Sequence, residues 1–125
     1  MGEKRRLSAI LAADMVGYSQ LMEADESGTI TRQKAHRAEL IDPGITQHNG
    51  RIVKTTGDGM LVEFASVVDA VKCAVAIQRE MVARETDVSD QPRIQCRIGI
   101  NIGDIVVNSQ QMEKIAHGYH LNYRM

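Results

Sequence analysis

The sequence predicts an α+β domain: a ferredoxin-like split βαβ sheet with helices on one face. Three observations predict it. Residues 7–16 form a short apolar run, residues 51–64 have the pattern of a β-hairpin around a glycine-rich turn, and residues 94–102 alternate strictly between apolar and polar side chains. Helical patterns separate these strands, so the expected order is strand, helix, hairpin, helix, strand.

The first strand is predicted from residues 7–16. Only Ser8 and Asp14 interrupt its apolar side chains, and such a run is typical of a strand that is buried on both faces. Gly17 is expected to end the strand. Ser19 is a candidate cap for the helix that follows.

The helical region before the hairpin is predicted in two parts. Residues 25–28 indicate a break or turn, and residues 29–40 have a loosely helical spacing of apolar side chains. Pro43 is expected to interrupt or kink this second helix, because proline lacks the backbone N–H that a helix interior needs.

The second half of the domain begins after the hairpin. Ser66 is the expected cap of a helix with one apolar face that extends to about Ala83. Ile94 then begins the alternating strand, the clearest strand signal in the chain. Gly103 and Asp104 are predicted to form a turn, with residues 105–107 as the hairpin partner of this strand.

Length and composition fit one globular domain rather than a disordered chain. The chain has 125 residues, of which 43% are hydrophobic and 25% are charged, and its net charge is -1. Balanced charge and only four aromatic residues argue against a nucleic-acid binder. Cys73 and Cys96 predict buried free thiols in a reducing compartment. No apolar run reaches the roughly 18 residues of a membrane span, so we expect a cytoplasmic protein.

Two carboxylates form the candidate site. Asp14 ends the predicted central strand, where a carboxylate costs free energy unless a partner compensates it. Asp58 lies at the tip of the hairpin turn, and the split βαβ order brings the first strand beside that hairpin. Two close carboxylates repel each other unless cations neutralise them, and Mg²⁺ takes one or two carboxylates together with substrate phosphates.

A phosphate-binding segment would complete this site. Residues 15–19 lead from the strand into a helix start, whose backbone N–H groups can bind phosphate. Each feature also has an ordinary interpretation: Asp14 as a cap or loop anchor, Asp58 as part of a tight turn, and Lys54 as a solvated edge charge. The prediction of a metal–triphosphate site rests on finding all of them in one topological order.

Three segments together resemble the class III adenylate/guanylate cyclase catalytic domain, most closely its bacterial adenylate cyclase branch. They are residues 9–19 (AILAADMVGYS), 51–64 (RIVKTTGDGMLVEF) and 97–104 (RIGINIGD). The resemblance covers about residues 5–107. It implies a nucleotidyl cyclase fold and an enzyme of signalling that converts ATP to cyclic AMP and pyrophosphate.

The resemblance also implies roles for individual residues. Asp14 and Asp58 would bind two Mg²⁺ or Mn²⁺ ions, with the backbone carbonyl of Met15 as a further ligand. The residues expected to contact the phosphates are Gly17, Tyr18 and Ser19. Lys54 would read the adenine ring. The family forms its site in a head-to-tail homodimer, so Lys54 would come from the partner of the chain that supplies the carboxylates.

After about residue 107 the sequence departs from the family pattern, so we expect an incomplete cyclase fold over residues 1–107 and a divergent tail over 108–125. In the family, a later helix carries an Asn and an Arg four residues apart that orient the ribose and stabilise charge on the α-phosphate. Asn122 and Arg124 are two residues apart, so they receive no such role. The alternatives are an inactive cyclase-fold module for dimerisation or nucleotide binding, and an unrelated ferredoxin-like interaction domain.

Other polar residues receive ordinary roles. His36 and His48 lie on the long helical segment without a third ligand at metal spacing, so surface or capping positions are predicted. Arg97, on the polar side of the alternating strand, is predicted to be a surface residue.

Overall fold

The computed structural model describes residues 5–86 and 92–106. Its elements are β1 (Arg5–Met15), α1 (Tyr18–Ala24), α2 (Glu26–His36), the π-helical turn η1 (Arg37–Ile41), α3 (Asp42–Gln47), β2 (Gly50–Thr55), β3 (Gly59–Phe64), α4 (Val67–Glu85) and β4 (Cys96–Val106). The strands form one antiparallel sheet in the order β2-β3-β1-β4. This is the order of the split βαβ sheet, so the predicted fold class is confirmed.

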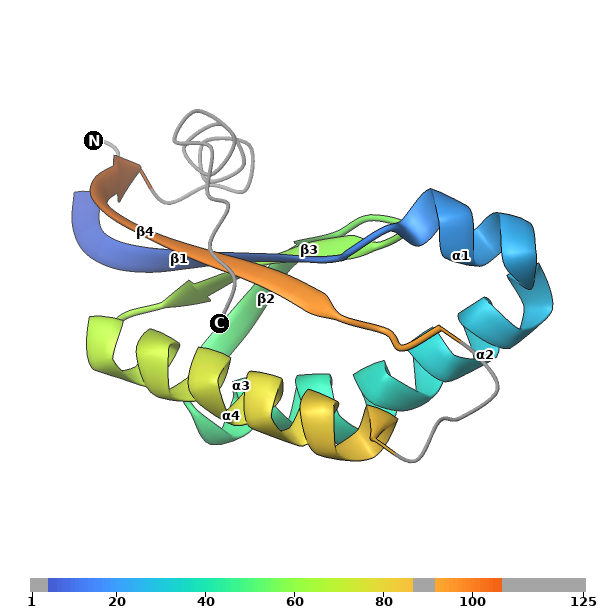
Figure 1. Cartoon of the computed structure of the whole chain (residues 1–125). Coiled ribbons are helices and arrows are strands. Elements are labelled where there is room, and N and C mark those ends of the chain that lie inside the picture. Colours follow the sequence, from blue (N-terminus) through green and yellow to red (C-terminus); the bar gives the residue numbers. More distant parts are fainter. Residues whose placement is uncertain (1–4, 87–91, 107–125) are drawn as a thin grey trace.

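The helices α3 and α4 pack on one face of the sheet (Figure 1). Alternate side chains of β1, including Ala9 and Leu11, point toward them and meet Phe64 of β3 and Ile98 of β4. From α4 the core receives residues at helical spacing, namely Ala70, Cys73, Ala74 and Ile77. The periods of two and 3.6 residues seen in the sequence thus meet in one core.

Strand β1 is also buried on its second face. Ile10 has the opposite parity to Ala9 and Leu11, yet it is fully buried and packs with Leu61 of β3. The continuous apolar run predicted this arrangement, because a strand covered on both faces cannot alternate.

The helix boundaries differ from those predicted. Ser19 does not cap α1, because the cap is Gly17, which has a left-handed backbone (φ 64°, ψ 34°) and makes no side-chain cap bond. Asp25 separates α1 from α2 by a single residue, and its side chain accepts a hydrogen bond from the Gly28 N–H at 3.0 Å. The predicted break is therefore confirmed, but the predicted cap is wrong.

The α-helical pattern is interrupted immediately before Pro43, so the prediction of an interrupted or kinked helix is confirmed. The chain passes from α2 through one π-helical turn directly into α3, where Pro43 lies in the first turn. Proline has no N–H to bond to the carbonyl four residues earlier, which belongs to Glu39 in the π-helical turn, so the regular α-helical bonding is broken there.

Strand β4 continues through the predicted turn. Gly103 pairs with Ser8 of β1, and Val106 pairs with Arg5. The predicted turn at Gly103 and Asp104 is wrong because β1 is long enough to pair with β4 along its whole length, which satisfies the backbone groups without reversal.

The prediction for His48 is confirmed, and the surface position predicted for His36 is wrong. His48 ends α3, and its Nδ1 lies 2.7 Å from the Gly44 carbonyl oxygen, so the capping role is confirmed. His36 is buried rather than at the surface. Its Nε2 lies 2.7 Å from Glu85, and Arg84 donates to its Nδ1 at 2.9 Å.

Two further expectations are settled in part. Cys73 is buried and Cys96 half-buried, and both are free thiols. Within residues 5–86 and 92–106, no helix combines the length and apolar character needed to cross a membrane. The tail 108–125 and its boundary at residue 107 lie outside the described residues and remain predictions.

Candidate active site

Asp14 lies near the end of β1, between the two strands that pair with it. Gly59 of β3 is its neighbour on one side and Arg97 of β4 is its neighbour on the other. Its side chain is 38% exposed. The central strand therefore presents this carboxylate at one end of the sheet, within reach of groups from both neighbouring strands.

Asp58 lies in the loop beside that strand end. The Met15 N–H donates to the Asp58 carbonyl oxygen at 3.1 Å. Gly59 lets the two segments approach closely, because a Cβ there would lie 2.9 Å from the carbonyl oxygen of Ala13. The two acidic residues predicted to share a site are thus at the same end of the sheet.

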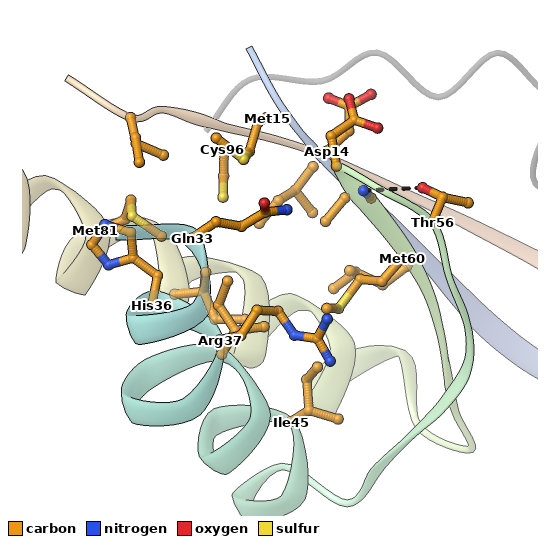
Figure 2. A pocket seen from close by; sticks show the side chains of 18 residues that line it. Asp14, Met15, Gln33, His36, Arg37, Ile45, Thr56, Met60, Met81 and Cys96 are labelled. Atoms are coloured by element: carbon orange, nitrogen blue, oxygen red, sulfur yellow. Dashed lines mark hydrogen bonds between the residues drawn. The ribbon is translucent and has the colours of Figure 1, made fainter. Parts of the chain in front are cut away.

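Asp14 and Asp58 both line one cavity of about 50 Å³. Figure 2 shows Asp14 and Thr56 on one side of it, with His36 and Arg37 on the helices opposite. Apolar side chains, including those of Met60 and Met81, form much of the remaining wall. Apolar walls lower the local dielectric constant, so charges at the edge of the cavity interact more strongly than they would in open water.

Arg97 binds Asp14 with two hydrogen bonds, from Nε and Nη2, each 3.0 Å long. The pKa of Arg97 is raised, first by these hydrogen bonds and then by the charge of Asp14, and the charge of Asp58 adds to the effect. The sequence analysis missed this residue by assigning it to the surface. A signal was available, since an arginine on the polar side of a strand is a natural partner for an uncompensated strand aspartate.

The residues predicted to contact phosphate lie at the start of α1. Gly17 and Ser19 are exposed and Tyr18 is half-buried. The Tyr18 hydroxyl lies 3.8 Å from the position that a Cβ on Gly57 would occupy, so the start of α1 and the Asp58 loop are close. The structure therefore brings the start of α1 beside the loop that carries Asp58.

Lys54 lies on a different strand from Asp14. It is exposed on β2, the edge strand, and pairs with Leu61 of β3. Strand β3 separates it from β1. Its position on the sheet edge is compatible with contact to a second chain, which is where the family resemblance assigns its role.

The donor set at this end of the sheet fits a hard divalent cation. Carboxylate oxygens and backbone carbonyls suit Mg²⁺ and Mn²⁺, which take their remaining ligands from water and phosphate. Among the described residues, no cluster of three or more Asp, Glu, His or Cys side chains could bind a metal ion. Burial, and then the charge of Asp14, raise the pKa of Cys96 to about 11, so its thiol stays protonated and is a poor ligand.

Comparisons with a family model and with known proteins point to the same family. The model of the adenylate and guanylate cyclase catalytic domain matches residues 3–119. The chain is 50% identical over 109 residues to "Putative adenylate cyclase 3" of Rhizobium meliloti (strain 1021), an alignment that covers 87% of this chain and 19% of that protein. The chain thus spans about a fifth of the length of this relative.

Two solved structures extend the comparison. The adenylate/guanylate cyclase/hydrolase from Silicibacter pomeroyi has a TM-score of 0.78 and 58% identity, with 86% of this chain and 62% of that chain covered. The guanylyl cyclase Cya2 has a TM-score of 0.73 and 28% identity, with 86% and 59% covered. The resemblance inferred from three short motifs is confirmed: this chain belongs to the adenylate and guanylate cyclase catalytic domain family.

Proposed function

We propose that this chain converts ATP to cyclic AMP and pyrophosphate in signalling, as one subunit of a head-to-tail homodimer in the cytoplasm. The observation that carries the proposal is the meeting of Asp14 and Asp58 at one end of the sheet, through the hydrogen bond from Met15 N–H to the Asp58 carbonyl. Both residues also line the same cavity.

In this proposal the carboxylates of Asp14 and Asp58, with the Met15 carbonyl, bind two Mg²⁺ or Mn²⁺ ions. Such ions, when bound, make the attacking 3′-oxygen of ribose more nucleophilic and stabilise charge on the departing phosphates. The chain itself positions charge and excludes water, and it forms no covalent bond to the substrate. Each oxygen of Asp14 accepts one hydrogen bond from Arg97 and keeps a further lone pair, and any ion would share this carboxylate with the arginine.

The triphosphate would extend along the start of α1. Gly17, Tyr18 and Ser19 supply its contacts in the proposal, supported by their closeness to the Asp58 loop. Arg97 adds a positive charge at the same end of the sheet, where its planar guanidinium matches phosphate as well as carboxylate.

ATP is the preferred substrate in this proposal because Lys54 of the partner subunit would donate to the adenine ring. The name of the Rhizobium meliloti relative, at 50% identity, supports ATP over GTP. Dimerisation is part of the proposal, since Lys54 is exposed on the edge strand β2 and β3 lies between it and Asp14 on β1.

The test is direct. The purified chain, incubated with Mn²⁺ and ATP, should produce cyclic AMP that liquid chromatography detects, and Asp58→Ala should abolish it. Calorimetry with Mn²⁺ and a non-hydrolysable ATP analogue provides the second measurement. Binding without cyclic AMP would replace the proposal with a catalytically inactive nucleotide-binding module. The absence of both binding and turnover would favour an interaction domain.

A further inference from the structure

The loop that carries Asp58, residues 56–58, is largely exposed. Asp58 lies between two glycines, Gly57 and Gly59, and both Thr56 and Gly57 are exposed. Glycine adopts many backbone conformations, and an exposed loop with few apolar contacts opens easily. The direction of the Asp58 carboxylate therefore depends on the hydrogen bonds that fix the loop.

Three of these hydrogen bonds come from the sheet. The Thr56 N–H donates to the Gly59 carbonyl at 2.8 Å, and the Gly59 N–H donates to Thr56 Oγ1 at 3.1 Å. The third is the bond from Met15 N–H to the Asp58 carbonyl. None of the three involves Gly57, the residue immediately before Asp58.

Gln33 of α2 supplies a fourth hydrogen bond, from the helical layer. Its Nε2 donates to the Gly57 carbonyl oxygen at 2.6 Å. The Gln33 side chain extends from α2 into the cavity that Asp14 and Asp58 also line (Figure 2). The loop is thus fixed from the sheet on one side and from a helix on the other.

Helix α2 is itself anchored beside Gln33. Arg32 and His36, on the same helix, both bind the carboxylate of Glu85 at the end of α4. Glu85 is only 4% exposed and also accepts from the Ile94 N–H at 2.7 Å. Burial would raise the pKa of Glu85, but the bonds from Ile94, His36 and Arg32 outweigh it and hold the pKa below its usual value. These charged hydrogen bonds hold helix α2 in place, and with it the backbone from which the Gln33 side chain extends.

We infer that Gln33 is a positioning residue for Asp58. Its amide fixes the Gly57 carbonyl, and this restricts the orientation of the neighbouring Asp58 carboxylate before any cation binds. The inference rests on the proposed cyclase function and adds to it a residue that touches neither metal nor nucleotide. Hydrogen-bonding partners of metal-site loops commonly change metal affinity or activity by about 10- to 100-fold when they are removed.

The test compares Gln33→Met with Gln47→Met. Methionine keeps the length of the side chain and loses the donor, and Gln47 is an exposed residue of α3 that lines no part of the cavity. With Gln33→Met, the Mn²⁺ concentration for half-maximal cyclic AMP formation should rise about tenfold. Without Mn²⁺ or nucleotide, hydrogen exchange at the Gly59 and Met15 amides should become faster. Gln47→Met should match the wild type in both measurements.

The outcomes separate the two proposals. Wild-type Mn²⁺ dependence and wild-type exchange in Gln33→Met would overturn the positioning role, and so would a lower melting temperature without either change. If the wild-type chain neither binds Mn²⁺ nor forms cyclic AMP, the proposed function fails instead. In that case the exchange rates alone decide whether Gln33 fixes the loop.

Discussion

Two arginine–carboxylate pairs in this molecule have similar chemistry and different surroundings. Arg97 and Asp14, at the candidate active site, have side chains that are 34% and 38% exposed. Arg32 and Glu85, between α2 and α4, have side chains that are 19% and 5% exposed. Asp14 accepts its two side-chain hydrogen bonds from Arg97, whereas Glu85 accepts from Arg32, His36 and the Ile94 backbone.

The difference in exposure means that Asp14 can exchange Arg97 for another partner, whereas Glu85 is held in its pair with Arg32. Water and salt screen a half-exposed pair, so Asp14 can replace Arg97 with another cation at little cost. A buried carboxylate has lost its hydration and is stable only while every donor remains. The chain thus keeps an available carboxylate in the sheet and a fixed one between the helices that support it.

The largest expected effect is on the exchangeable carboxylate. Asp14→Asn should lower the rate of cyclic AMP formation by about 10³-fold or more, because it removes a charge that the cations need. The melting temperature should change little, because Asp14 is half-exposed. Rate assays and thermal unfolding of the same preparation check both parts. Activity within tenfold of wild type would contradict the assigned role.

The fixed carboxylate should show the opposite behaviour. Glu85→Gln should lower the free energy of unfolding by about 3 kcal/mol, because it leaves buried donors without their charged acceptor. Urea unfolding measures this. Glu39→Gln is the matched control: Glu39 binds Arg84, but its side chain is 61% exposed, so the loss should stay below about 1 kcal/mol. Equal losses in the two variants would remove the distinction between the pairs.

Acid should act on the same buried site. The pKa of Glu85 is lower in the folded chain than in the unfolded chain. The ionised Glu85 side chain therefore stabilises the fold fully above its unfolded-chain pKa, and this stabilisation is lost as the pH falls through its folded-chain pKa. The melting temperature should therefore decline below about pH 4. In Glu85→Gln the decline should be shallower, and a decline of unchanged steepness would assign the acid sensitivity to other carboxylates.

The smallest expected effect concerns Arg97 in the absence of nucleotide. Arg97→Leu removes the group that competes for Asp14, so Mn²⁺ alone should bind more tightly, by no more than about fivefold. Calorimetry measures the affinity, and Arg79→Leu, which alters an exposed arginine on α4, serves as the control. Weaker Mn²⁺ binding in Arg97→Leu would show that the arginine supports the cations rather than competing with them.

The sequence by itself determined the strand order and the meeting of Asp14 with Asp58. Hydrophobic periods of two and 3.6 residues are local, and a split βαβ order leaves the first strand beside the hairpin, so chain order alone brings these acids together. The same local reasoning placed a turn at Gly103, where β4 instead continues and pairs with β1.

Tertiary structure alone decided which partners the polar groups find. Arg97 reaches Asp14 from 83 residues away, and His36 reaches Glu85 from 49 residues away. Such contacts depend on the register of β4 against β1 and on how α2 docks against α4, and neither quantity is encoded in a local pattern. The sequence could name the two acids, but only the packed sheet and helices bring Arg97 to Asp14 and Gln33 to the loop that carries Asp58.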